Sequence, residues 1–213
     1  MYKIEYLDLN EKVYLALKEM ILKSELKSGD KLKQEKLARQ LGVSRTPLQS
    51  AFYRLEKEFL VEIKPRKGAF VKHLSLQEFQ ELYDIRCRLE SLGAYEAAKR
   101  ATRSEITQLE KHLNIFQEKV ERGDSPGILE ADYNYHMAIM KMSKNVLLFR
   151  MISSFNILVI SNMEGLLKPA IRSLEEHREL FQSIKNNQAE LAEKQMYLHI
   201  FDAKERIQEK IVN

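Results

Sequence analysis

The sequence predicts a mainly α-helical protein, in which an N-terminal winged helix-turn-helix domain with a small β-hairpin is followed by an all-α antiparallel helical bundle. Apolar residues recur at helical spacing along most of the 213 residues, and strand-like runs are confined to residues 60–72. Only 7 Gly and 4 Pro are present, which argues against an all-β fold rich in tight turns. We expect the first domain at residues 1–73 and the second at residues 75–213.

The first domain begins with two helices. Apolar residues at helical spacing predict one helix that ends before the turn-forming residues 27–30. A second, shorter helix fits residues 34–41, and Gly42 follows it at the usual place for a left-handed cap. The apolar residues that predict the first helix are Val13, Leu17, Met20 and Ile21.

A third helix follows within a few residues and is itself followed by the hairpin. Ser44 or Thr46 can cap this helix, and Pro47 lies in its first turn, where a missing N–H group costs nothing. Its predicted apolar face consists of Leu48, Ala51, Phe52, Leu55 and Phe59. The hairpin is predicted as a strand, a turn and a second strand at residues 60–63, 64–68 and 69–72.

Such a helix-turn-helix has a direct functional interpretation, because its second helix enters the major groove of DNA with its N-terminal residues leading. Arg45 can bond guanine O6 and N7, Gln49 can bond adenine, and the neighbouring hydroxyls can hold phosphates. Basic residues on the turn of the wing can reach a phosphate backbone, and Gly68 allows a close approach. The predicted DNA-contacting residues are Ser44, Arg45, Thr46, Gln49, Arg66, Lys67 and Gly68. A plain three-helix interaction domain, in which these residues only cap a helix, fits the same spacing.

The charge distribution is compatible with both interpretations. Residues 1–74 hold 16 Lys and Arg against 10 Asp and Glu, whereas residues 75–213 hold 19 against 21. The overall net charge of +4 is too small to name a partner, but its concentration in the first domain suggests that this domain meets a polyanion. A lysine-rich solvated surface gives a similar count.

Three stretches of the first domain resemble the winged-helix domain of GntR-family transcription regulators: residues 41–48 (Leu-Gly-Val-Ser-Arg-Thr-Pro-Leu), residues 54–56 (Arg-Leu-Glu) and residues 66–71. The turn at residues 27–32 is similar to the family's Pro-Gly-Asp-x-Leu turn. The resemblance implies a regulator that binds a double-stranded DNA operator. The chain departs from the family pattern at three places, so the resemblance does not imply an operator sequence. These are Ser28 for a proline, Gln34-Glu35 for a pair such as Glu-Arg, and Gln49 for an arginine.

After residue 74 the pattern is helical throughout. Ser-x-x-Glu at residues 75–78 and Thr-x-x-Glu at residues 102–105 are capping-box signatures, and each predicts the start of a helix. Residues 123–127 form the clearest break in the chain. Further helices are expected at residues 128–142, 146–167, 174–186 and 188–212, which completes a bundle of roughly six helices.

Histidine and aspartate are the candidate metal ligands of this second domain. Asp132 and His136 are four residues apart and therefore project from one face of a helix, and His177 and His199 lie on two later predicted helices. Three imidazoles and one carboxylate suit a divalent ion that keeps positions open for a ligand. Spacing alone does not show that the four converge, since a single histidine is more often a core or surface group. His73 and His112 receive no role.

The second domain resembles the FadR-type effector domain of the same family, because Asp-x-x-x-His, Glu-His-Arg and a last-helix histidine follow in that order. The resemblance implies one divalent metal ion per chain, Zn or Ni with Mn or Co as alternatives, held by Asp132, His136, His177 and His199. It also implies a small carboxylate effector and a homodimeric repressor on a pseudo-palindromic operator. Arg86 matches an arginine that can pair with the effector, and a surface ion pair is the alternative for this residue.

Two other classes of protein compete with a regulator. A metal-dependent hydrolase can use a site of three histidines and one aspartate to activate water, but it also needs a general base and an oxyanion partner. The motifs HExxH, GxxxxGK[ST] and GxGxxG are all missing from the sequence. A module that only dimerises leaves the candidate ligands unexplained. We therefore predict that the protein is not an enzyme.

Composition and cysteine count, together with the lack of targeting segments, lead to an expected cellular location. Hydrophobic residues make up 44% and charged residues 31%, which is ordinary for a folded chain. The single cysteine, Cys87, excludes a disulfide framework and a CxxC motif. No signal peptide is recognisable, and no apolar run approaches the ~20 residues of a membrane span. A cytoplasmic protein without a membrane partner is expected.

Overall fold

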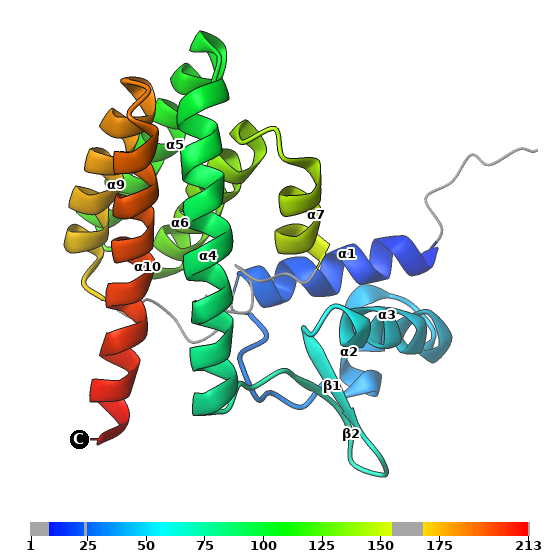
Figure 1. Ribbon diagram of the computed structural model, residues 1–213. Helices are drawn as coiled ribbons and strands as arrows, with labels where there is room; N and C mark the ends of the chain where they lie inside the picture. The colour runs from blue at the N-terminus through cyan, green and yellow to red at the C-terminus, as the bar shows by residue number, and fades with distance from the viewer. Residues whose placement is uncertain (1–8, 24, 155–167, 213) are drawn as a thin grey trace, which may run out of the picture. The chain divides into compact units, whose positions relative to one another are not determined.

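Residues 9–23, 25–154 and 168–212 are described by the computed structural model (Figure 1). The chain divides into two units, Met1–His73 and Leu74–Asn213. The elements of the first unit are α1 (Leu9–Leu22), α2 (Gln34–Leu41), α3 (Arg45–Lys57), β1 (Val61–Lys64) and β2 (Gly68–Val71). Its helix α3 contacts α1, α2 and β1, so the predicted second helix of the helix-turn-helix lies at the centre of this unit.

Polar contacts add to the apolar packing between α1 and α3. The guanidinium of Arg54 lies 3.6 Å from the centre of the Tyr14 ring. The Tyr14 hydroxyl donates to the Glu58 carboxylate at 2.8 Å, and the Lys18 ammonium donates to the same carboxylate at 3.2 Å. Arg54, the first residue of the Arg-Leu-Glu stretch at residues 54–56, therefore stabilises the unit directly.

The turn between α2 and α3 follows the sequence prediction. Gly42 has a φ of +65°, which favours glycine, and its N–H donates to Ala38 O and Arg39 O at the end of α2. Ser44 occupies the N-cap position of α3, but its side chain makes no capping hydrogen bond. The hydroxyl is therefore not used to close the helix.

The predicted position of Phe59 on the apolar face of α3 is wrong. The helix ends at Lys57, and Phe59 has a φ of +59° and is 54% exposed. The N–H of Leu60 donates to Leu55 O at 2.9 Å, so the chain reverses here and Leu60 becomes fully buried. Helical spacing alone could not detect this reversal.

Strands β1 and β2 form an antiparallel hairpin with Val61 opposite Val71 and Lys64 opposite Gly68. The Lys67 N–H donates to Lys64 O at 3.0 Å and closes the turn. The predicted wing is thus present, with each strand within one residue of its expected bounds.

The second unit is an antiparallel helical bundle, as predicted. Its described helices are α4 (Leu76–Arg100), α5 (Arg103–Arg122), α6 (Ser125–Met142), α7 (Val146–Ser154), α9 (Ala170–Lys185) and α10 (Ala189–Val212). Helix α4 contacts α6, α7, α9 and α10, and α5 contacts α6 and α9. The predicted helix at residues 146–167 is observed up to Ser154, and its remainder, residues 155–167, lies outside the described residues.

Both predicted capping boxes are confirmed. Ser75 and Thr102 each accept a hydrogen bond from a backbone N–H three residues later, and the glutamates at those positions accept from the cap N–H. The break at residues 123–127 is shorter than predicted, because the Asp124 carboxylate accepts from Gly127 N and α6 begins at Ser125.

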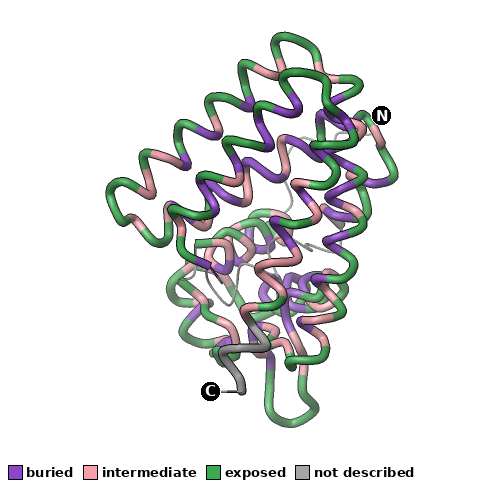
Figure 2. The backbone as a smooth tube through the Cα atoms, turned by 60° about the vertical axis from the view of Figure 1, so that its left-hand side comes forward, coloured by how far each residue is buried: buried purple, intermediate pink, exposed green. Residues whose placement is uncertain are grey.

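Buried residues follow the inward faces of the helices, as the purple stretches in Figure 2 show. The core of the second unit includes fully buried Phe116, Tyr135, Ile139 and Leu174. Polar residues also lie in this interior, and they mark the candidate site. Among the described residues, no helix is both long enough and apolar enough to span a membrane.

Candidate metal centre and nucleic-acid surface

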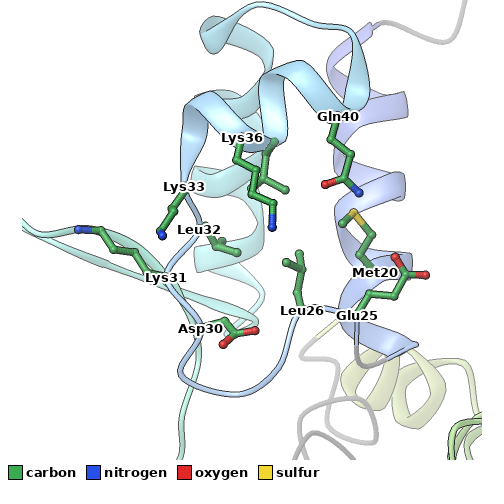
Figure 3. A pocket seen from close by; sticks show the side chains of 10 residues that line it. Met20, Glu25, Leu26, Asp30, Lys31, Leu32, Lys33, Lys36 and Gln40 are labelled. Carbon is green, nitrogen blue, oxygen red and sulfur yellow. The ribbon is translucent and has the colours of Figure 1, made fainter.

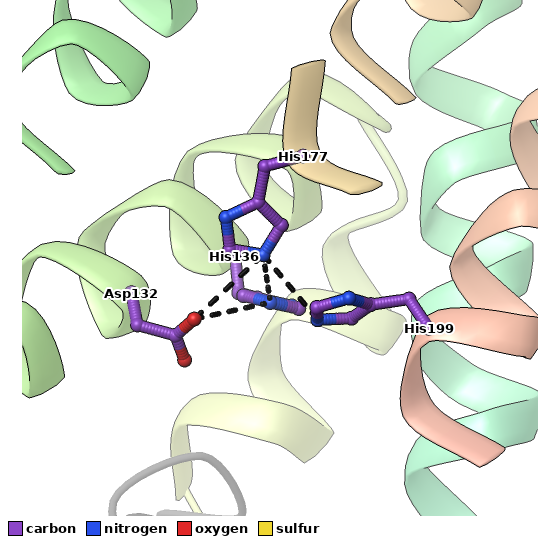
Figure 4. A group of neighbouring side chains, drawn as sticks. All are labelled: Asp132, His136, His177 and His199. Carbon is purple, nitrogen blue, oxygen red and sulfur yellow. Dashed lines mark hydrogen bonds and ion pairs between the residues drawn. The ribbon is translucent and has the colours of Figure 1, made fainter. Parts of the chain in front are cut away.

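Three helices bring the four predicted ligands together inside the second unit. Asp132 and His136 come from α6, His177 from α9 and His199 from α10. One ligand atom from each side chain lies within 4.8 Å of the others, and all four residues are buried. Figure 4 shows the three imidazole rings and the carboxylate converging on one point.

The distances between the inward-facing atoms are short. His177 Nε2 lies 3.3 Å from His136 Nε2 and 3.3 Å from His199 Nε2. Asp132 Oδ1 lies 3.7 Å from His177 Nε2 and 3.9 Å from His136 Nε2. Metal–ligand bonds of about 2.0–2.2 Å place neighbouring ligand atoms roughly 3–3.5 Å apart around one ion. The set therefore fits a divalent ion after small adjustments.

A buried carboxylate of α4 fixes the orientation of His136. Glu90 Oε2 lies 2.5 Å from His136 Nδ1, and Glu90 is fully buried. Burial alone disfavours the charged carboxylate, but Arg86 and then His136 outweigh this effect and lower the pKa of Glu90 to about 2. An ionised Glu90 accepts the Nδ1 proton of His136, which leaves the Nε2 lone pair facing the other ligands.

Arg86, the predicted effector-binding residue, is only 4% exposed, so the alternative of a surface ion pair is wrong. Its Nε donates to Glu90 Oε1 at 2.6 Å, and its guanidinium lies 4.8 Å from the centre of the Tyr83 ring. Burial opposes its charge, yet the Glu90 carboxylate raises the pKa of Arg86 above its usual value. Arg86 therefore supports Glu90 and, through it, His136.

A second carboxylate, Glu176 of α9, lies behind His199. Its Oε2 is 2.7 Å from His199 Nδ1 and also pairs with the Lys168 ammonium. Lys168 Nζ donates to the backbone carbonyl of His199 at 2.9 Å. Two of the three histidines thus have a carboxylate at Nδ1, the arrangement that orients metal-binding histidines in proteins.

His177 is held by aromatic and backbone contacts. Its ring stacks on Tyr135 with the centroids 4.5 Å apart, and the Tyr135 hydroxyl donates to His177 O at 2.8 Å. Its buried Nδ1 has no hydrogen-bond partner within the described part of the chain.

Burial, followed by the neighbouring positive groups, lowers the pKa values of His177 and His199 well below the usual value. Both rings are therefore neutral near pH 7, as a metal ligand must be. The Nε2 atoms of the three imidazole rings and one carboxylate oxygen thus form a set of ligand atoms suited to a divalent ion.

Sequence reasoning found the four inward-facing residues but missed Glu90, Glu176 and Lys168. Glu90 lies four residues after Arg86 on the same face of α4, and this pairing was an available signal. Glu176 directly precedes His177, yet it orients His199 instead. Its partner is determined by the packing of α9 on α10, which sequence spacing does not show.

The other predicted site residues lie on the surface of the first unit. Those at the start of α3 are all exposed: Ser44, Arg45, Thr46 and Gln49. Arg45 Nη2 donates to Glu35 Oε1 of α2 at 2.6 Å. This end of α3 thus presents hydrogen-bonding side chains to the solvent, as a recognition helix does.

The wing turn is also exposed, and its backbone is unusual. Arg66 has a φ of +62° at the position after Pro65, where a turn of this kind normally has glycine or asparagine. Gly68 has a φ of +100°. The left-handed backbone at Arg66 is therefore strained relative to what glycine would adopt there.

A pocket of the first unit is lined by both acidic and basic side chains, with Glu25 and Asp30 beside three lysines. It lies where the end of α1, the following loop and α2 meet, and Lys31, Lys33 and Lys36 line it together with Leu26 and Leu32 (Figure 3). Its lining contains no histidine or cysteine.

Comparison with known proteins identifies the family. Residues 9–71 match the model of bacterial regulatory proteins of the gntR family, and residues 81–202 match the FCD domain. The chain is 30% identical to the HTH-type transcriptional regulator YdhC of Bacillus subtilis over 191 residues, which cover 87% of this chain and 85% of that protein. It is 24% identical to the HTH-type transcriptional repressor RspR of Escherichia coli, over 94% and 89% of the two chains.

Solved structures show the same fold. The structure of E. coli McbR/YncC has a TM-score of 0.82 at 23% identity, and the alignment covers 98% of this chain and 100% of that one. A GntR regulator from Rhodococcus has a TM-score of 0.81 at 20% identity, over 93% and 97% of the two chains.

The chain therefore belongs to the GntR family and carries an FCD domain. It is a DNA-binding transcription regulator of this family. The family consists of regulators rather than enzymes, in agreement with the sequence prediction.

Proposed function

We propose that the protein is a cytoplasmic, homodimeric repressor that binds a pseudo-palindromic operator and responds to a small carboxylate at one divalent metal ion per chain. In this proposal residues 1–73 bind DNA, and residues 75–213 bind the effector and dimerise. The observation that carries it is the buried cluster of Asp132, His136, His177 and His199, found in a chain that also has a winged helix.

The charges around the cluster support an anionic effector. Glu90 is balanced by Arg86 and Glu176 by Lys168, so within the described part of the chain Asp132 is the remaining formal charge beside the three imidazole rings. A divalent ion held there leaves one net positive charge inside the bundle, and a buried charge requires a partner. One carboxylate supplies that partner, since Zn, Ni, Mn and Co all accept such a ligand beyond His and Asp.

The hydrolase alternative is less well supported by the same contacts. Among the described residues, Glu90 and Glu176 are the carboxylates in contact with the outer nitrogen atoms of the histidines, and each already pairs with a histidine and a cation. Neither is therefore available as the general base that such an enzyme needs.

Coupling between effector and DNA requires that the effector bind the DNA-competent and DNA-incompetent states with different affinity. Chain connectivity gives one route, because β2 ends only a few residues before α4 and α4 carries Glu90 and Arg86. A movement of His136 therefore acts first on Glu90 and α4, the helix that follows the wing.

The experiment that tests the proposal is binding of the purified protein to DNA upstream of its own gene, with unrelated DNA as control. Preference for the upstream fragment, weakening with salt and changing with metal chelation or added carboxylates, is expected. The variant His177→Ala is expected to lose bound metal and effector response but to keep DNA binding. Full metal content in that variant contradicts the four-ligand site, and failure to bind any DNA at low salt contradicts the regulator.

A further inference from the structure

The two carboxylate–histidine pairs of the candidate centre differ in their surroundings. The Glu90–His136 pair is fully enclosed, with side-chain exposures of 0% and 1%. The Glu176–His199 pair lies at the edge of the bundle, and the Glu176 side chain is 24% exposed. Glu176 and His199 both line an open groove between α9 and α10. The His199 side is therefore the more accessible part of the cluster.

Lys168 holds this edge together. Its ammonium is nearly inaccessible, pairs with Glu176 Oε2, and donates to His199 O at 2.9 Å. It also lies 3.1 Å from His199 Nδ1. When Glu176 accepts the Nδ1 proton of His199, both Nδ1 and the Lys168 ammonium are donors. The contact between these two nitrogen atoms is then not a hydrogen bond. The contacts of Lys168 with the Glu176 carboxylate and with His199 O tie Glu176 of α9 to the backbone of α10.

A second cation supports Glu176 from the groove. Arg172 Nε donates to Glu176 Oε1 at 3.2 Å, and Arg172 Nη2 donates to Asp202 Oδ1 at 3.0 Å. Both oxygens of Glu176 are thus held, and the carboxylate is fixed in direction. A fixed acceptor at Nδ1 selects the tautomer of His199 in which Nε2 presents its lone pair to the cluster.

We propose that Lys168 and Glu176 are a positioning pair that sets the tautomer of His199 and thereby the affinity and the release rate of the metal ion. The inference rests on the metal centre proposed above. The enclosed Glu90 pair keeps His136 in place, whereas the edge pair determines whether His199 stays bound. Loss of the edge pair accelerates metal release without removing any ligand.

The test uses the full-length protein, zinc alone as the probe, and competition with a chelator to measure affinity and release rate. Glu176→Ala removes the acceptor, Glu176→Gln keeps the shape but can donate as well as accept, and Lys168→Met removes the cation. Each is expected to weaken zinc binding by about 10- to 100-fold. The matched control is Glu179→Ala, which removes a carboxylate from the same groove and is expected to leave affinity unchanged.

The tautomers of the histidines in metal-free protein give an independent readout by long-range proton–nitrogen NMR. In the wild type we expect His199 to carry its proton on Nδ1. In Glu176→Gln and Glu176→Ala the proton is expected to redistribute toward Nε2, while His136 stays unchanged. If Glu176 only stabilised the fold, its replacement would lower the thermal midpoint without a selective change in the tautomer of His199.

The outcomes separate this inference from the function on which it rests. Zinc affinity within about twofold of wild type in the Glu176 variants, or an unchanged His199 tautomer, overturns the positioning pair but leaves the metal centre standing. Wild-type protein that binds neither zinc nor nickel overturns the metal centre, and the inference falls with it. Weakened binding together with a changed His199 tautomer supports both.

Discussion

Arg45, the leading side chain of α3, is hydrogen-bonded at 2.6 Å to Glu35 of α2. Both side chains are well exposed, at 64% and 70%, so this pair adds little to stability. Its significance is for binding, because a donor of Arg45 that bonds Glu35 is not available to a base or a phosphate. In the proposed function, in which Arg45 contacts DNA, Glu35 competes for this donor.

Two opposite effects are expected from this pair. Arg45→Ala is expected to weaken operator binding by ~1–3 kcal/mol, the range for one lost bidentate base contact. Glu35→Gln is expected to strengthen binding to operator and unrelated DNA alike, since it frees the arginine and removes a negative charge. The measurement is a titration of both fragments at several salt concentrations.

The control for the charge effect is Glu19→Gln, which removes an exposed carboxylate of α1 that pairs with Lys23, the residue after this helix. A gain as large as that of Glu35→Gln would show that net charge, rather than release of Arg45, is responsible. Unchanged operator affinity in Arg45→Ala would remove this residue from the base-contacting set.

Arg66 gives a second prediction, because its φ of +62° suits glycine better than arginine. Arg66→Gly is expected to stabilise the first unit by up to about 1 kcal/mol and to weaken DNA binding at the same time. Thermal unfolding and DNA titration measure the two effects separately. Lys67→Gly, which removes a neighbouring charge without relieving a positive φ, is the control. A variant that gains stability and binds DNA as before would show that the wing arginine has no role in binding.

The elements that were predicted correctly are those specified by local sequence. Capping boxes at Ser75 and Thr102, and the glycine cap at Gly42, depend on residues three or four positions apart. Phe59 was assigned wrongly because the end of α3 depends on Leu60 turning into the core, which is a tertiary effect.

The candidate site shows the same division. Asp132 and His136 are recognisable by their spacing, but spacing could not show that His177 and His199 converge with them, and the resemblance to the family strengthened that expectation. Glu90 lies on another helix, 46 residues before His136 in the sequence. It could be found only by noticing its pairing with Arg86.

The capping box at the start of α5 provides a prediction about pH. The Lys144 ammonium and the backbone N–H of Thr102 lower the pKa of Glu105 to about 2. A carboxyl group with a lowered pKa in the folded state stabilises the protein above its unfolded pKa, and the stabilisation is lost as pH falls through the folded value. Glu105→Gln is thus expected to cost about 1 kcal/mol at pH 7, and the difference from wild type should shrink between about pH 4.5 and pH 2.

The measurement is the free energy of unfolding of both proteins across this pH range. Glu121→Gln, on the same helix, is the control and is expected to show a smaller difference at pH 7. A Glu105→Gln difference that stays constant down to pH 2 would show that the ionised carboxylate does not stabilise the helix start.

The buried pair of Arg86 and Glu90 gives the last prediction, which separates stability from metal binding. Glu90→Gln leaves the Arg86 charge buried without its carboxylate, and it keeps only one acceptor oxygen for Arg86 and His136, which each bond a separate oxygen of Glu90. The expected cost is about 3–5 kcal/mol of unfolding free energy, together with about 10- to 100-fold weaker zinc binding. The double variant Arg86→Met/Glu90→Leu replaces the pair with apolar groups and is expected to recover most of the stability. It is not expected to recover zinc affinity, because His136 then lacks its acceptor. Recovery of both properties would show that Glu90 acts on the metal centre only through the stability of the bundle.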